Sequence, residues 1–261
     1  MIGAGIDRVD GRAKVTGAAK YSYEQPVPNA VYAVIVSSTI AAGRVTSIDT
    51  AQARALPGVL AILTHENAPR VDPNGADRKL QVLQDDKVLY DRQPVAVVIA
   101  DTFERATDAA NRVVVRYERG PVAATIDAPT AAEFTPKSAN NVSADSSRGT
   151  FDAAFAAAPV KLDNRYATPP EFHNPMEPHA TVAVWNGAKL TLYDAAQGVF
   201  TRRSAIAKVM RMNGNDVRVI AKFIGGGFGS KGGTNPHHAL AAMAAKAAGR
   251  PVKLVLTRPQ M

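Results

Sequence analysis

The feature that most constrains this chain is a glycine-rich segment that directly follows an apolar run. Residues 220–233 read IAKFIGGGFGSKGG. Glycine adopts positive φ without steric cost, and the backbone N–H groups of such a loop can gather around an anionic group. The pattern therefore predicts a strand that leads into a cofactor-binding loop. A plain glycine-rich turn without a ligand is the alternative, because glycine also serves ordinary turns.

The glycine-rich segment can be compared with two known phosphate-binding motifs by the spacing of its residues. The phosphate loop of nucleotide triphosphatases requires G-x-x-x-x-G-K followed by Ser or Thr, whereas here Lys231 lies between Ser230 and Gly232, so the register fails. The spacing Gly227-x-Gly229-x-x-Gly232 does satisfy the dinucleotide fingerprint. However, no Asp or Glu follows it in the sequence to bind a ribose hydroxyl. Both nucleotide-binding interpretations are therefore disfavoured.

The composition restricts the chemistry that side chains can supply. The 261 residues are enough for one large or two ordinary domains with a hydrophobic core. The absence of cysteine excludes disulfides, thiolate metal sites, iron–sulfur ligation and a cysteine nucleophile. A redox centre would thus have to be a bound cofactor or belong to a partner.

The charge and the apolar pattern bear on partners and location. The net charge of +8 is scattered along the chain, so we expect no nucleic-acid partner and attribute the charge to anionic ligands or an acidic partner surface. The N-terminus lacks an apolar signal region, and no apolar stretch is long enough to span a membrane. We expect a soluble cytoplasmic protein without membrane contact, or a periplasmic one if a partner carries the export signal.

The order of predicted elements gives an α+β fold in two parts. Residues 1–125 alternate strands and short helices, with a helix capped by Asp101 and Glu104. Residues 126–149 are rich in Pro, Ala, Ser and Asn and read as a linker. Residues 150–261 form the second domain. Its predicted elements are a helix at 150–158, a hairpin around Asn186-Gly187, a helix at 200–212 with Arg202 on its polar face, a strand at 217–224, a helix from Pro236 and a strand at 252–257.

Outside the glycine-rich segment, three positions carry candidate polar groups. The segment Glu171–His179 holds two histidines and two carboxylates, but its prolines prevent a zinc-binding helix. We instead expect a loop in which Glu177 or His179 hydrogen-bonds to backbone or to a cofactor. The pair His237 and His238 begins a helix, where imidazoles either meet an anion or face solvent. Gln197 ends a strand, where its amide can both donate and accept.

Four segments together resemble the molybdenum-binding large subunit of the xanthine dehydrogenase and aldehyde oxidase family. They are residues 7–21, 56–59, 93–98 and 225–231. The resemblance implies an α/β hammerhead domain at 1–125 and the first part of a molybdopterin-binding domain at 150–261. It further implies hydroxylation of an aldehyde or an N-heterocycle with oxygen drawn from water. The cofactor would be molybdopterin, in its cytosine dinucleotide form, and molybdenum would be held through the pterin rather than by side chains.

The same resemblance assigns roles to five residues. Gln197 matches the glutamine that hydrogen-bonds a molybdenum oxo ligand, and Phe228 and Gly229 match positions beside the metal. Gly226 and Gly227 match the cofactor cradle. Apolar packing of Phe228 in the core is the alternative for that residue. Purine-oxidising members carry a glutamate after the loop lysine, where this chain has Gly232, so the resemblance favours an aldehyde over a purine such as xanthine.

The length of the chain departs from the family. Family members continue into a second molybdopterin-binding domain that contains the catalytic glutamate base, and we expect the isolated chain to be inactive without it. The implied partners are an iron–sulfur subunit with 2Fe-2S clusters, an FAD-binding subunit and a C-terminal molybdopterin-domain polypeptide. The alternative is a catalytically inactive remnant that serves as a docking module for the iron–sulfur subunit.

Overall fold

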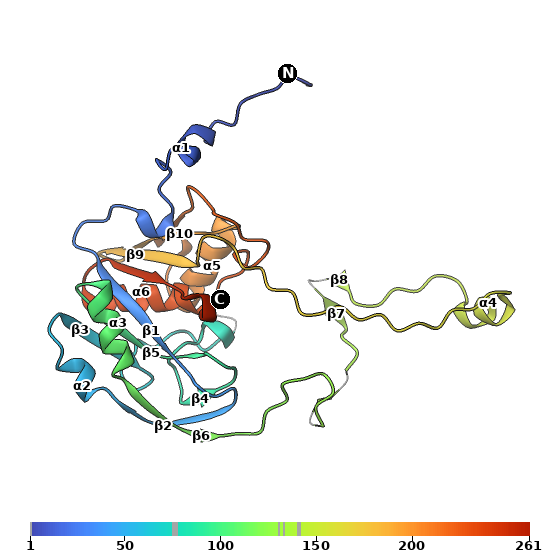
Figure 1. Ribbon diagram of the computed structural model, residues 1–261, viewed down its shortest axis with the longest axis horizontal. Helices are drawn as coiled ribbons and strands as arrows, with labels where there is room; N and C mark the ends of the chain where they lie inside the picture. Colours follow the sequence, from blue (N-terminus) through green and yellow to red (C-terminus); the bar gives the residue numbers. More distant parts are fainter. Residues whose placement is uncertain (1, 75–77, 130, 133, 140–141) are drawn as a thin grey trace. The chain divides into compact units, whose positions relative to one another are not determined.

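The computed structural model describes residues 2–74, 78–129, 131–132, 134–139 and 142–261 (Figure 1). The chain divides into two compact units. The first combines Met1–Pro121 with His173–Met261, and the second is Val122–Phe172. The first unit therefore combines two stretches that are distant in the sequence, and it contains Gln197, the glycine-rich segment and the histidine pair His237 and His238.

A seven-stranded mixed sheet organises the first unit (Figure 1). Its strand order is β11-β10-β9-β12-β1-β5-β3. Strands β1 and β12 pair in parallel, with Val31 opposite Val252, and this pairing joins the two distant parts of the sequence in one sheet. The strands are β1 (Val31–Ser37), β3 (Val59–Thr64), β5 (Pro94–Ala100), β9 (Ala180–Asn186), β10 (Lys189–Asp194), β11 (Val217–Ile220) and β12 (Val252–Val255).

Helices cover the two faces of this sheet. Val97 and Ile99 of β5 belong to the large core that includes α6 (Pro236–Ala248), whereas Val98 packs with Ala109 of α3 (Phe103–Asn111). Because successive side chains of a strand point to opposite faces, α6 and α3 lie on opposite sides of the sheet. The remaining helices of this unit are α1 (Gly11–Val15), α2 (Ala51–Arg54), α5 (Val199–Val209) and 3₁₀ turns at Ser22–Glu24, Arg78–Leu80, Gly214–Asp216 and Arg258–Gln260.

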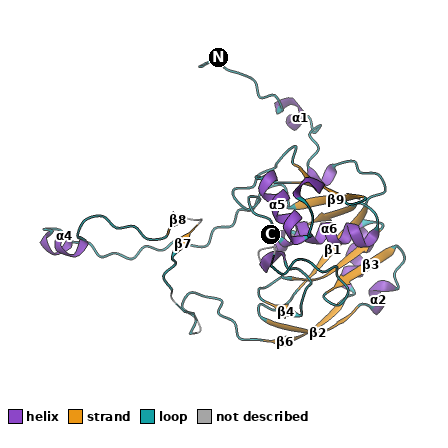
Figure 2. Ribbon diagram, turned by 180° about the vertical axis from the view of Figure 1, so that it is seen from behind, coloured by secondary structure: helices purple, strands orange, loops and turns teal. Residues whose placement is uncertain are grey.

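Helix α6 is the central element of the core (Figure 2). All nine of its residues from His237 to Ala245 are buried. Its alanines have small side chains, and the helix packs against β9, β12 and β5. A helix that is apolar on every side is stable only when it is surrounded by other elements. The two histidines in its first turn are therefore buried with it, and the solvent-facing interpretation of that pair is wrong.

Two smaller groups of elements complete the fold. A three-stranded sheet in the first unit has the order β4-β2-β6, formed by β2 (Gly43–Asp49), β4 (Lys87–Val88) and β6 (Val114–Arg119). The second unit contains β7 (Ser138–Ala139), β8 (Val142–Ser143) and α4 (Phe151–Ala157), where the rings of Phe151 and Phe155 stack 5.4 Å apart. Across the described residues, no helix has the length and apolarity that a bilayer-crossing segment needs.

The predicted α+β class is confirmed, while several local predictions need correction. The hairpin at Asn186-Gly187 forms as predicted, with Asn186 opposite Lys189. Helix α3 is capped by Thr102 rather than by Asp101, since Thr102 Oγ1 accepts a hydrogen bond from the Arg105 N–H at 3.2 Å. The last strand before the glycine-rich segment ends at Ile220 rather than at Ile224. Residues 221–224 thus already belong to the loop.

Candidate cofactor-binding site

The candidate site lies where β10 and β11 end. These strands are parallel neighbours, with Tyr193 opposite Ile220, so the segments that follow them leave the sheet at the same edge. Gln197 follows β10, and the loop Gly225–Lys231, hereafter the glycine loop, comes after β11. The sheet topology therefore brings together the two parts of the site that the sequence separates by about 30 residues.

The backbone of the glycine loop explains part of its composition. Gly226 and Gly229 have φ values of +92° and +103°, which side-chain-bearing residues rarely adopt. Phe228 also has a positive φ, +52°, which is uncommon for a bulky residue and costs free energy. The residue is 71% exposed. The alternative in which Phe228 packs into the core is therefore wrong, and the loop presents this ring at the surface.

Gln197 is hydrogen-bonded to the glycine loop through one end of its carboxamide. Its Oε1 accepts hydrogen bonds from the N–H groups of Gly229 and Lys231, both at 3.2 Å. Its own backbone N–H donates to the Lys231 carbonyl at 3.1 Å. Because two N–H donors require an acceptor, the carboxamide oxygen must face the loop and the Nε2 group must point away. No acceptor among the described residues bonds to Nε2, so Gln197 offers unused donors.

Three consecutive N–H groups of the glycine loop are also unused. The N–H groups of Gly225, Gly229 and Lys231 donate within the chain, but those of Gly226, Gly227 and Phe228 have no acceptor among the described residues. Successive unpaired N–H groups around a left-handed turn form a concavity that suits an anionic or oxygen-rich group. Together with Gln197 Nε2, they form a set of donors that this chain does not satisfy.

The close approach of backbone to side chains accounts for two other glycines. A Cβ atom on Gly227 would lie 2.7 Å from Gln197 Oε1 and 2.8 Å from Gln197 Cδ. A Cβ atom on Gly225 would lie 2.6 Å from Glu177 Cβ. Both separations are shorter than real Cβ contacts allow. A side chain at either position would therefore displace its neighbour, the end of the Gln197 side chain at Gly227 and Glu177 at Gly225.

A buried ion pair connects both ends of the glycine loop to the segment before β9. The Lys231 side chain is fully buried, and its Nζ donates to Glu177 Oε2 at 2.8 Å and to the Glu177 carbonyl at 2.9 Å. The Gly225 N–H donates to the same Oε2 at 2.8 Å, and Ser22 Oγ donates to Oε1 at 3.2 Å. The predicted hydrogen bonding of Glu177 to backbone is confirmed, while its pairing with Lys231 was not predicted.

A second buried ion pair lies behind the loop. Arg202, predicted on the polar face of its helix, is only 1% exposed and pairs with Asp194. Its Nη2 donates to the carbonyls of Lys231 at 2.9 Å and Gly233 at 2.6 Å. Thr181 Oγ1 donates to Asp194 Oδ1 at 2.8 Å. The placement of Arg202 on an exposed face is therefore wrong, because its charge is neutralised by Asp194 and its Nη2 group binds the carbonyls of Lys231 and Gly233.

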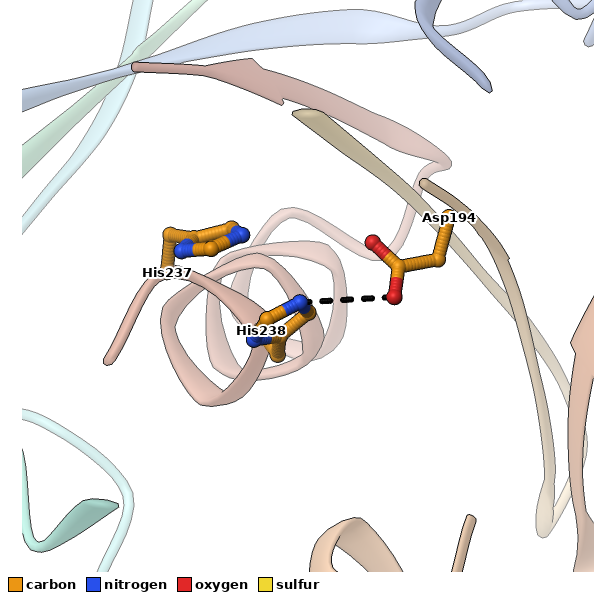
Figure 3. A group of neighbouring side chains, drawn as sticks. All are labelled: Asp194, His237 and His238. Carbon is orange, nitrogen blue, oxygen red and sulfur yellow. Dashed lines mark ion pairs between the residues drawn. The ribbon is translucent and has the colours of Figure 1, made fainter. Parts of the chain in front are cut away.

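Two histidines of α6 lie beside Asp194 (Figure 3). His238 Nε2 is 3.3 Å from Asp194 Oδ2, and His238 Nδ1 accepts the Asn235 N–H at 2.9 Å. Burial raises the pKa of Asp194, but the charges of His238 and Arg202 outweigh it and hold that pKa below its ordinary value. Burial lowers the pKa of His237 well below 6.5.

This cluster of Asp194, His237 and His238 has the composition of a metal site, but its contacts favour a structural role. Both carboxylate oxygens of Asp194 are already bound, one by Thr181 and the other by Arg202. A metal ion at Asp194 would place a second cation next to the Arg202 guanidinium. We therefore assign Asp194 a structural role, in which it neutralises Arg202, whose Nη2 group binds the carbonyls of Lys231 and Gly233.

A cavity of about 270 Å³ adjoins the far end of the glycine loop. Ser230, His179 and His237 contribute to its lining, whereas Gln197 and residues 226–229 do not. His179 Nε2 lies 3.3 Å from the Ser230 carbonyl, as predicted for a histidine bonding to backbone, and burial lowers its pKa. The unused donors of the loop and of Gln197 therefore do not line this cavity.

The glycine loop and Gln197 thus lie together at one edge of the mixed sheet. Comparison with known proteins shows to which class of protein this chain belongs. The family model of the aldehyde oxidase and xanthine dehydrogenase α/β hammerhead domain matches residues 16–121. The model of the molybdopterin cofactor-binding domain matches residues 134–261. The chain belongs to the aldehyde oxidase and xanthine dehydrogenase family of molybdenum enzymes. The predicted order of a hammerhead domain followed by a molybdopterin-binding domain is confirmed.

Individual relatives agree with this assignment. The chain is 41% identical over its whole length to the aldehyde oxidoreductase molybdenum-binding subunit PaoC of Escherichia coli K12, of which it covers 35%. It is 33% identical over 97% of its length to the xanthine dehydrogenase molybdenum-binding subunit of Escherichia coli O157:H7, covering 36% of it. The aldehyde oxidoreductase structure from Desulfovibrio gigas superposes with a TM-score of 0.83 at 26% identity, over 98% of this chain and 30% of that one. The chain thus spans about a third of the length of these relatives.

Proposed function

We propose that this chain forms one wall of the molybdopterin pocket in a molybdenum-dependent hydroxylase that oxidises an aldehyde. The observation that carries the proposal is the set of unused donors made by Gln197 Nε2 and the N–H groups of Gly226, Gly227 and Phe228. These groups fit a ligand rich in oxygen acceptors, which the molybdenum cofactor is. The family model for residues 134–261 supports the same ligand.

In this proposal, the residues of this chain bind the cofactor and orient it. The three N–H groups and Gln197 Nε2 donate hydrogen bonds to acceptor oxygens of the cofactor and hold it against the loop. Gly229 provides the left-handed turn that ends the cradle, and the exposed Phe228 ring restricts the access of water next to it. When bound, the cofactor supplies the two-electron oxidation in which an oxygen atom derived from water is added to the substrate carbon.

An aldehyde is the substrate class that we propose. Gly232 follows Lys231 at the position where the family resemblance places a glutamate in purine-oxidising members. The most similar of the relatives described above carries the name of an aldehyde oxidoreductase. We further propose the cytosine dinucleotide form of molybdopterin, 2Fe-2S clusters and FAD on partner subunits, a partner polypeptide that supplies the catalytic base, and a cytoplasmic location.

The test is molybdenum loading and turnover in an assembled complex. The chain is co-expressed with candidate partner subunits, and molybdenum is measured by mass spectrometry. In a loaded complex, Gln197→Ala should lower kcat for an aldehyde on the order of 10²-fold, as removal of one preorganised donor does elsewhere. Gln52→Ala, an exposed glutamine on α2, is the matched control and should leave kcat unchanged. Absence of molybdenum from every complex would contradict the proposal and favour the docking-module alternative.

A further inference from the structure

The pair formed by Glu177 and Lys231 joins three segments that are distant in the sequence. Glu177 lies in the segment before β9, Lys231 lies 54 residues later at the end of the glycine loop, and Ser22 comes from the N-terminal region. Lys231 Nζ is fully buried, and its only acceptors among the described residues are the Oε2 and carbonyl oxygens of Glu177. A fully buried ammonium requires such a partner, so Glu177 determines where the lysine lies.

One carboxylate oxygen holds both ends of the glycine loop. Glu177 Oε2 accepts from the N–H of Gly225, the first residue of the loop, and from Nζ of Lys231, the last one. The Glu177 N–H also donates to the Gly225 carbonyl at 3.0 Å. The separation of the loop ends is thereby fixed by a single side chain. The residues between them carry the unused N–H groups.

The same lysine holds Gln197 through its backbone. The Lys231 N–H donates to Gln197 Oε1, and the Lys231 carbonyl accepts from the Gln197 N–H. A displacement of Lys231 would therefore weaken the bonds that select the orientation of the Gln197 carboxamide. Glu177 is linked to Gln197 in two steps, first by its ion pair with Lys231 and then by the backbone of that residue.

We propose that Glu177 is a positioning residue for the cofactor site. By closing the glycine loop through Gly225 and Lys231, it holds Gln197 with its Nε2 donors turned away from the loop. It touches neither substrate nor cofactor in this role. The catalytic consequence rests on the proposed function, whereas the effect on the loop is a property of this chain alone.

The first test is hydrogen–deuterium exchange of the 261-residue chain, followed by mass spectrometry. Glu177→Gln keeps the shape of the side chain but removes its charge, and the proposal expects peptides that cover the glycine loop to exchange at least 10-fold faster relative to peptides from α6. Asp108→Asn, which makes the same chemical change in the exposed pair with Arg112, is the control and should leave the loop unchanged. Unchanged loop exchange in Glu177→Gln would overturn the proposal.

A double variant separates positioning from general stability. Glu177→Gln combined with Lys231→Met has no unpaired buried charge, so it should recover the thermal stability that Glu177→Gln loses. It still lacks the link from Nζ to residue 177, so the loop should remain at least 10-fold less protected than in the wild type. Recovery of both stability and loop protection would show that the pair only stabilises the fold, and would overturn the proposal.

Kinetics of the loaded complex give a second, independent readout. Glu177→Gln should lower kcat about 10-fold at unchanged KM for the aldehyde, and it should have no further effect when Gln197 is already alanine, because both changes act on the same carboxamide. Equal effects of Glu177→Gln in the two backgrounds would overturn the positioning role. If Glu177→Gln speeds hydrogen exchange in the glycine loop but no complex acquires molybdenum, the proposed function is contradicted. The effect of Glu177 on the loop would still be supported.

Discussion

The close contact between Gly227 and Gln197 gives the sharpest prediction, the substitution Gly227→Ala. The added methyl group would lie 2.7 Å from Gln197 Oε1 and 2.8 Å from Gln197 Cδ. Gly227 does not have a positive φ, so the backbone itself tolerates alanine. The strain must therefore be relieved by moving the Gln197 carboxamide, which ends a flexible side chain.

The magnitude follows from the bonds that such a movement breaks. Gln197 Oε1 accepts two hydrogen bonds, from Gly229 and Lys231, and both are 3.2 Å long. Each contributes about 0.5–1.5 kcal/mol to stability, and bonds of this length belong to the weaker part of the range. The free energy of unfolding should fall by about 1–2 kcal/mol. Turnover should fall much more, because the displaced carboxamide no longer presents Nε2 to the cofactor.

A double-mutant cycle with Gln197→Ala tests this reasoning. Denaturant unfolding of the 261-residue chain gives the free energy for each variant. Without the glutamine side chain there is no clash, so Gly227→Ala should cost less than about 0.5 kcal/mol in that background. Gly233→Ala is the matched control, since among the described residues its added methyl group would lie within 4 Å of Lys79 Nζ alone, at 3.7 Å. An equal cost of Gly227→Ala with and without Gln197 would refute the proposed clash.

Two further predictions concern buried charge. Arg202→Met leaves Asp194 buried and without its cation, so the free energy of unfolding should fall by about 3–5 kcal/mol in denaturant titrations, against less than about 1 kcal/mol for Arg112→Met in an exposed pair. Equal losses would argue against the network. Burial lowers the pKa of His237, so near pH 6.5 the imidazole takes up a proton only in the unfolded chain. The free energy of unfolding should therefore have its full value above that pH and decline below it. His237→Gln should flatten this decline between pH 7 and 5, whereas substitution of the exposed His173 should not; an unchanged slope would contradict the assignment.

The local pattern of the sequence was sufficient to predict a glycine-rich loop after a strand. A run of glycines after an apolar segment has few physical explanations. Two of them, the phosphate loop of nucleotide triphosphatases and the dinucleotide fingerprint, were disfavoured by residue spacing and by the lack of a following acidic residue. The capping residue of α3 was harder to predict. Asp101 and Thr102 are both good caps, and the choice depended on Arg105, whose side chain pairs with Asp101 while its N–H bonds to Thr102.

The residues that hold the loop in place could not be predicted from local patterns. Arg202 lies among other basic residues on a helix whose apolar and charged positions suggested an exposed face. Its burial depends on Asp194 and on the carbonyls of Lys231 and Gly233. These two carbonyls are 29 and 31 residues away from Arg202 in the sequence. The sequence held one sign that buried charges support the loop, namely Lys231 within the glycine-rich segment. A charged side chain in a tightly packed turn requires a partner of opposite charge.

The sequence by itself determined the class of this protein, through the four segments that resemble the family, and it determined the glycine loop, because glycines at fixed spacing need no tertiary contact to be noticed. Only the family resemblance, and not spacing, indicated Gln197. The tertiary structure alone decided how they work together. The parallel pairing of β10 and β11 brings Gln197 to the loop, the two N–H donors turn its carboxamide, and Glu177 and Arg202 neutralise or bind groups that would otherwise be buried without partners. Such contacts depend on distances in space, and residue spacing along the chain does not specify those distances.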